Sequence, residues 1–82
     1  MITVNVKLFA AAKDIAGAGE VRLSLPDGSL ASEVIEALIK RNLEFLKWKK
    51  YLRLAVNREY INNDQPLHDN DEVAVIPPVS GG

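Results

Sequence analysis

Residues 30–41 read LASEVIEALIKR, and this stretch decides the fold. Its apolar residues recur at intervals of three and four, the spacing that places side chains on one face of an α-helix. That face comprises Leu30, Ala31, Val34, Ile35 and Leu38. The sequence therefore predicts one main helix with an apolar stripe that must pack against another part of the chain.

The residues at both ends of this helix agree with the pattern. A PDG turn at residues 26–28 precedes it, and Ser29 is in position to act as the N-cap. Glu33 near the start, and Lys40 and Arg41 at the end, complement the helix dipole.

Alternating segments on both sides of the helix predict β-strands. Residues 2–9 (ITVNVKLF) and 20–25 (EVRLSL) alternate before it, and residues 51–57 (YLRLAVN) alternate after it. A brief strand is predicted at Tyr60 and Ile61. Residues 72–76 (EVAVI) are apolar on both faces, which is typical of a strand that is covered on both sides or carries an interface.

Two segments connect these elements. Residues 10–17 (AAAKDIAG) predict a short helix with a glycine stop, whereas residues 42–50 (NLEFLKWKK) fit a loop or an irregular extension. Strands before and after one good helix predict an α+β fold in which a sheet packs on that helix. With 82 residues, we expect a single domain over residues 1–82, of which 77–82 form an extended tail.

The composition narrows the possible chemistry. The chain is 48% hydrophobic, carries a net charge of −1 and contains no cysteine. Disulfides, thiolate zinc sites and cysteine-ligated iron–sulfur clusters are therefore excluded. The start of the chain has no signal-peptide pattern, and no apolar run reaches the roughly 20 residues of a membrane span. We expect a soluble cytoplasmic protein that binds neither nucleic acid nor a membrane.

The sequence after the last strand begins with two prolines, which restrict the backbone, and ends in two glycines, which have no side chains. It comprises Pro77, Pro78, Val79, Ser80, Gly81 and Gly82. The prolines end the strand ladder and favour extended backbone, and the glycines would pass through a channel that rejects a β-carbon. Fully extended, this tail would reach about 20 Å.

The tip of such a tail offers one reactive group, its α-carboxylate. This group has a pKa near 3.5 and is an unreactive anion at neutral pH. It must become a mixed anhydride, such as an acyl adenylate, before sulfur or nitrogen can attack its carbonyl carbon. The alternative is a frayed end without function, in which case removing Gly81 and Gly82 would change nothing.

The C-terminal half of the chain, residues 54–82, resembles the sulfur-carrier subunits of molybdopterin synthase, a family of ubiquitin-like proteins. The matching segments are AVN (55–57), PL (66–67), DEVA (71–74), PPVSGG (77–82) and, near the start, LFAAAKDIAG (8–17). The resemblance implies a β-grasp fold, in which a mixed sheet of four to five strands packs on one main helix and a flexible C-terminal tail follows.

The resemblance also implies a function. A ubiquitin-activating-like adenylyltransferase would use ATP to adenylate Gly82, and a sulfur donor protein would convert it to a thiocarboxylate, 1-thioglycine. The tail would then enter the large synthase subunit, where the sulfur attacks the pyranopterin precursor and builds the molybdopterin dithiolene. The chain would be no enzyme on its own and would bind no cofactor. The family suggests a synthase of two small and two large subunits.

A partner-binding face follows from strand parity and from the family pattern. If Val6, Leu8, Val73 and Val75 face the helix, then Phe9, Ala74 and Ile76 face the other side of the sheet. The resemblance assigns partner contacts to Phe9, Tyr60 and Ile76, although Tyr60 replaces an expected aliphatic residue. The alternative is that the short helix or a loop covers this face.

Other polar clusters favour ordinary surface roles. His68 is the only histidine, and we expect a solvated turn residue and no metal site. DNDE at 69–72 predicts a turn entering the last strand. KWKKYLR at 47–53 predicts a solvated edge with Trp48 partly buried, or a contact for an acidic partner.

Three other functions remain open at this stage. The first is a sulfur carrier for thiamine synthesis or tRNA thiolation, and the second is a ubiquitin-like protein modifier. The third is a β-grasp binding module whose tail has no role.

Overall fold

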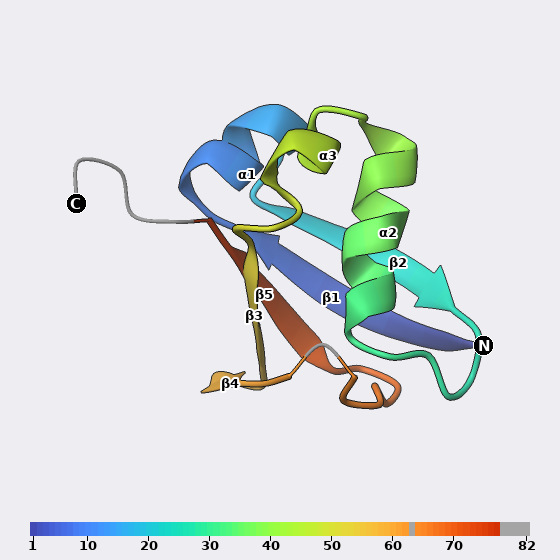
Figure 1. The fold of residues 1–82 in the computed structure, drawn as a ribbon. Helices are drawn as coiled ribbons and strands as arrows, with labels where there is room; N and C mark the ends of the chain where they lie inside the picture. Colours follow the sequence, from blue (N-terminus) through green and yellow to red (C-terminus); the bar gives the residue numbers. More distant parts are fainter. Residues whose placement is uncertain (63, 78–82) are drawn as a thin grey trace.

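The computed structural model describes residues 1–62 and 64–77, in which five strands form one mixed sheet (Figure 1). In chain order the elements are β1 (Ile2–Leu8), α1 (Ala10–Ala16), β2 (Glu20–Leu25), α2 (Ser32–Arg41), α3 (Phe45–Trp48), β3 (Arg53–Val56), β4 (Glu59–Tyr60) and β5 (Glu72–Ile76). The strands lie in the order β2-β1-β5-β3-β4. β1 and β5 are parallel, and the other neighbouring pairs are antiparallel.

The three helices lie on one face of this sheet (Figure 1). The alternation read from the sequence is realised in β1, where every second residue from Ile2 to Leu8 is buried. The core joins β1 and β5 to the helices through Val4, Val6, Leu8, Val73, Val75, Val34, Ile35, Leu38 and Phe45. The prediction of a β-grasp fold, with a mixed sheet packed on one main helix, is confirmed.

The main helix begins later than the sequence predicts. α2 starts at Ser32, and its N-cap position has no side-chain hydrogen bond. Ser29 is only 3% exposed, and its hydroxyl donates to the carbonyl of Pro26 at 2.7 Å. The prediction that Ser29 caps the helix is therefore wrong.

The reason is a bridge between the start of this segment and residues 65–67. The backbone N–H of Ala31 donates to the carbonyl of Gln65, and that of Leu67 donates to the carbonyl of Ser29, both at 2.8 Å. The carbonyl of Ser29 and the N–H of Ala31 are therefore bonded to residues outside the helix. The regular helix begins only after them, at Ser32. The carboxylate of Glu33 reaches back and accepts from the N–H of Leu30 at 2.7 Å.

Residues 42–50, for which the sequence allows a loop or an irregular extension, contain the one-turn helix α3. Phe45 is 1% exposed in the core, and the partly buried Trp48 packs against the core, as predicted for that residue. The brief strand is Glu59–Tyr60, one residue earlier than predicted. None of the helices in the described ranges combines the length and apolar character of a membrane span.

One end of the sheet gathers several elements. Because β1 and β5 are parallel and β3 runs against β5, the ends of β1 and β5 lie beside the start of β3. α1 follows β1 and α3 precedes β3, so both helices lie at this end. Figure 1 shows the N-terminus at the opposite end of the sheet.

Candidate functional site

The predicted tail starts from the central strand of the sheet. β5 is paired on both sides, with β1 through Leu8 and Val75, and with β3 through Arg53 and Ile76. Pro77 follows at once and is buried. Since proline has no N–H, it ends the ladder at Ile76. The core thus fixes the position at which the described chain leaves the sheet, up to the buried Pro77.

Most of the predicted tail lies outside the described residues. This applies to Pro78, Val79, Ser80, Gly81 and Gly82. Their roles, including that of Gly82 as the site of chemistry, stay predictions. Pro77 is the one tail residue whose place is described.

The sheet face opposite the helices, which we call the open face, carries the predicted partner residues. Strand register places side chains in a row across four strands, with Lys7 on β1, Ala74 on β5, Ala55 on β3 and Tyr60 on β4. The centre of this row consists of two alanines, so the face is shallow there. Ala74 is partly buried and Ala55 is only 6% exposed, so the larger side chains around them make up most of the exposed surface.

Phe9 and Ile76 lie together at the end of the open face from which the tail leaves. Leu8 is paired with Val75, so the next residue of each strand, Phe9 and Ile76, are neighbours. Phe9 is 48% exposed, and Ile76 is partly buried. Neither α1 nor a described loop covers Phe9, which answers the alternative that this face is hidden.

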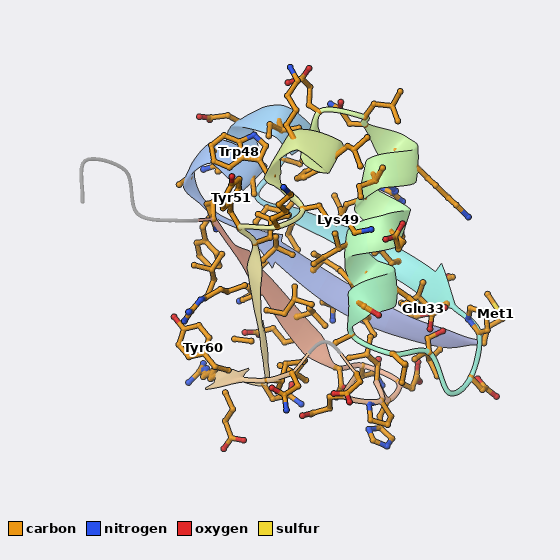
Figure 2. The ribbon with its side chains drawn as sticks, in the orientation of Figure 1. Met1, Glu33, Trp48, Lys49, Tyr51 and Tyr60 are labelled. Atoms are coloured by element: carbon orange, nitrogen blue, oxygen red, sulfur yellow. The ribbon has the colours of Figure 1, made fainter. Side chains whose placement is uncertain are left out.

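Tyr60 shares the open face but lies farther away. β3 separates β4 from β5, so Tyr60 is two strand spacings, about 10 Å, from Ala74, and Ile76 lies two residues farther along β5. The tyrosine is 69% exposed and projects from the short edge strand (Figure 2). The structure therefore places Phe9 and Ile76 directly after a paired position of β1 and β5, and it places Tyr60 at a separate, outer position.

Charged side chains bound the apolar part of the open face. Lys7 and Glu72 form an ion pair of 3.4 Å between β1 and β5. Arg53 is the first residue of β3 and is paired with Ile76. Arg53 is a residue of this face that sequence reasoning missed. Its position two residues before Ala55 indicates the face, because residues two apart in a strand lie on the same side of the sheet.

The acidic turn at 69–72 uses its carboxylates to hold the backbone. Asp69 accepts from the N–H of Thr3 at 2.7 Å, and Asp71 accepts from the N–H of His68 at 2.8 Å. The side chain of His68 is 83% exposed. Within residues 1–62 and 64–77, no group of three or more His, Asp or Glu side chains is placed to hold a metal ion. The turn thus fits the structural role predicted for it.

The comparisons with known proteins agree with this geometry. The model of the ThiS family matches residues 6–82, which is nearly the whole chain.

The chain belongs to the ThiS family.

Among curated members of this type, the molybdopterin synthase sulfur carrier subunit of Dictyostelium discoideum is 39% identical over 81 residues, which cover 95% of this chain and 94% of that one. The solved structure of molybdopterin converting factor, subunit 1, from Pyrococcus furiosus is 33% identical, with a TM-score of 0.87 and coverage of 96% of this chain and 100% of that one. The resemblance to sulfur-carrier subunits is thereby confirmed.

A further solved structure with the same fold carries a different name. Small archaeal modifier protein 1 from Methanosarcina acetivorans is 29% identical, with a TM-score of 0.80 and coverage of 100% of this chain and 98% of that one. The same fold and a similar sequence thus occur in a protein named as a modifier.

Proposed function

We propose that this ThiS-family chain is the sulfur-carrying small subunit of a molybdopterin synthase, with Gly82 as the carrier position. The observation that carries the proposal is the 39% identity to a sulfur carrier subunit over nearly the whole chain. The geometry supports it, since Pro77 follows directly on β5, which is paired with a strand on each side, and the exposed apolar residue Phe9 lies at the same end of the sheet.

The chemistry proceeds in two steps at Gly82. Its carboxylate oxygen attacks the α-phosphate of ATP on an activating enzyme, which forms the acyl adenylate and releases pyrophosphate. A hydrosulfide equivalent from a sulfur donor protein then attacks the carbonyl carbon and displaces AMP, leaving a thiocarboxylate. The first step is needed because the free carboxylate is an anion at neutral pH.

The carrier then delivers sulfur to the large subunit. The tail enters the active site of that subunit, and the thiocarboxylate sulfur attacks the pyranopterin precursor. Water then cleaves the bond between this sulfur and the Gly82 carbonyl carbon, which leaves the sulfur on the precursor and returns Gly82 to its carboxylate form. Two such transfers supply the two sulfurs of the dithiolene. In this division of labour the small chain holds and presents the sulfur, while the large subunit provides the catalytic pocket.

Intact-protein mass spectrometry tests the proposal. The chain, incubated with its cognate activating enzyme, ATP and a sulfur source, should gain the mass difference of sulfur for oxygen, and fragmentation should localise it to Gly82. A variant with one residue added after Gly82 should fold normally and gain nothing. No gain in the wild type, under conditions that convert a known carrier, would contradict the proposal.

A second candidate is a protein modifier, favoured by the 29% identity to a small archaeal modifier protein. It shares the adenylate but ends in an isopeptide bond between Gly82 and a lysine of another protein. Tryptic peptides bearing a remnant of the tail on lysine would reveal this outcome. A carrier for thiamine synthesis or tRNA thiolation would instead co-purify with a thiazole synthase or a tRNA thiolase.

A further inference from the structure

The charges of this chain are distributed very unevenly. Residues 40–53 hold six of the ten Lys and Arg residues but only one of the eleven Asp and Glu residues. This segment has a net charge of +5 in a chain whose net charge is −1. A local field of this size is large enough to influence how the molecule approaches a charged partner.

The same segment exposes apolar side chains that the core does not need. Leu43 is 73% exposed and Leu46 is 57% exposed, whereas the intervening Phe45 is buried at 1%. Lys47 and Lys50 follow at near-helical spacing from the two leucines and are exposed as well.

We call this surface the α3 face, and it consists of Leu43, Leu46, Lys47, Lys50 and Tyr51. Tyr51 is 56% exposed.

The lysines of this region make only exposed ion pairs within the described chain. Lys49 pairs with Glu36 at 2.6 Å, with both side chains about half exposed. Lys47 pairs with Glu44 at 3.4 Å, both side chains being more than half exposed. Exposed pairs of this kind contribute between about 0 and 1 kcal/mol and exchange easily for a better partner. Lys50 and Arg53 form no ion pair with any described residue.

The α3 face lies at the end of the sheet from which the tail leaves. Arg53 is paired with Ile76 in an antiparallel register. Leu52 and Tyr51, which precede Arg53, therefore lie at the end of the sheet where Pro77 follows Ile76. Figure 2 shows Trp48 and Tyr51 on the side of the molecule where β5 ends. Any protein that takes up the tail therefore approaches this cationic region as well.

We propose that the α3 face is a second docking surface, which binds an acidic surface with an apolar centre beside the tail channel of the large synthase subunit. This inference rests on the proposed function, and it adds to the open face a contact on the helix side of the sheet. The +5 charge of residues 40–53 requires an acidic partner surface. The exposure of Leu43 and Leu46 requires an apolar centre in that surface.

Charge suits the task of a carrier that must bind and leave in every cycle. Complementary charge raises the association rate by 10- to 1,000-fold or so, while exposed pairs add little to the lifetime of the complex. The α3 face thus speeds docking of the loaded tail without trapping the spent one. The two exposed leucines fix the position of the partner on the α3 face.

The test measures binding kinetics with the purified large subunit encoded in the same genome. Lys50→Glu should lower the association rate constant about tenfold at low ionic strength and leave the dissociation rate nearly unchanged. The difference should vanish between about 0.01 M and about 1 M salt, where the Debye length falls from about 30 Å to about 3 Å. Lys47→Glu/Lys50→Glu should show a larger effect in the same direction.

Arg22→Glu is the matched control. Arg22 is exposed on β2, at the edge of the sheet farthest from β3 and β4. Its side chain belongs to the open face and lies outside the α3 face, and its reversal changes the net charge by the same amount. Leu43→Ser/Leu46→Ser should speed dissociation without altering the salt dependence. Urea unfolding of each variant checks that the fold is retained.

The outcomes separate this inference from the proposed function. Equal kinetics for wild type, Lys50→Glu and Arg22→Glu, with sulfur loading at Gly82 intact, would overturn the second docking surface alone. Equal loss for Lys50→Glu and Arg22→Glu would overturn it too, because net charge would then suffice. A wild type that neither loads sulfur nor binds the large subunit would refute both.

Discussion

Asn57 and Glu72 form two hydrogen bonds with each other where β3 ends and β5 begins. The backbone N–H of Asn57 donates to the carbonyl of Glu72 at 2.8 Å, and the N–H of Glu72 donates back to Oδ1 of Asn57 at 3.1 Å. Nδ2 of Asn57 also donates to Asp71 at 3.0 Å. This asparagine ends β3, starts the turn into β4 and fixes the start of β5, the strand that presents the tail.

Replacing this asparagine should therefore destabilise the whole sheet. Asn57 has a φ of 51°, a conformation that asparagine tolerates better than alanine does. Asn57→Ala loses both side-chain hydrogen bonds and adds backbone strain, for a combined cost of about 2–3 kcal/mol. Urea unfolding measures this loss.

Asn57→Gly separates the two causes. Glycine adopts the same φ without strain but cannot make the side-chain hydrogen bonds, so it should lose only about 1–2 kcal/mol. If the glycine variant were as unstable as the alanine variant, the left-handed backbone would not be part of the explanation.

The end of α1 offers a test of one glycine against another. Gly17 has a φ of +73°, and a β-carbon there would meet nothing within 4 Å, so its cost is conformational alone. Gly17→Ala should lose about 1 kcal/mol of unfolding free energy. In Gly19→Ala the β-carbon would make an ordinary contact of 3.6 Å with Lys13, and thermal unfolding should show a smaller change. Equal melting temperatures for the two variants would contradict this reading of the turn.

Phe45 in α3 should be essential for stability although the sequence pattern around it is weak. Phe45→Ala would empty a site that is 1% exposed and should cost about 3–5 kcal/mol, a large share of the stability of a small domain. The next residue, Leu46, is 57% exposed, and Leu46→Ala should change stability by less than about 0.5 kcal/mol. Comparable losses for both would mean that α3 packs through its other face.

The contrast between Phe45 and Leu46 also shows where sequence reasoning stops. Alternation in residues 2–9 and the stripe in 30–41 each match one period and predict buried faces correctly. In residues 42–50 apolar residues are consecutive, so no period distinguishes the inward from the outward side chains. Only the packing of α3 against the core decides between them.

The helix start failed for a similar reason. Ser29 has the right chemistry for an N-cap, but its carbonyl is taken by Leu67, thirty-eight residues later in the chain. A local propensity is overridden by a long-range bridge that one sequence does not reveal. For the site, parity placed Ala74 and Ile76 on the face opposite the buried Val73 and Val75, as the structure has them. The offset of Tyr60 depends on β4 pairing with β3 rather than with β5.

Phe9 links the fold to the proposed partner and gives the sharpest prediction. It holds the N-cap position of α1 in extended conformation, with no side-chain hydrogen bond. Phe9→Ser would supply a capping hydroxyl, worth about 1 kcal/mol, and would lose a half-buried ring, costing about the same. The unfolding free energy should therefore stay within about 1 kcal/mol of wild type. Affinity for the large subunit should fall at least about tenfold, because aromatic side chains are enriched among the residues that anchor protein interfaces.

Phe9→Ala completes the argument, since it loses the same ring without gaining a cap. Its affinity should match that of Phe9→Ser, while its unfolding free energy should be about 1 kcal/mol lower. Calorimetric titration with the large subunit and urea unfolding give the two quantities independently. Should Phe9→Ser bind as tightly as the wild type, Phe9 would be only the first residue of a helix, and the open face would lose its part in the partner interface.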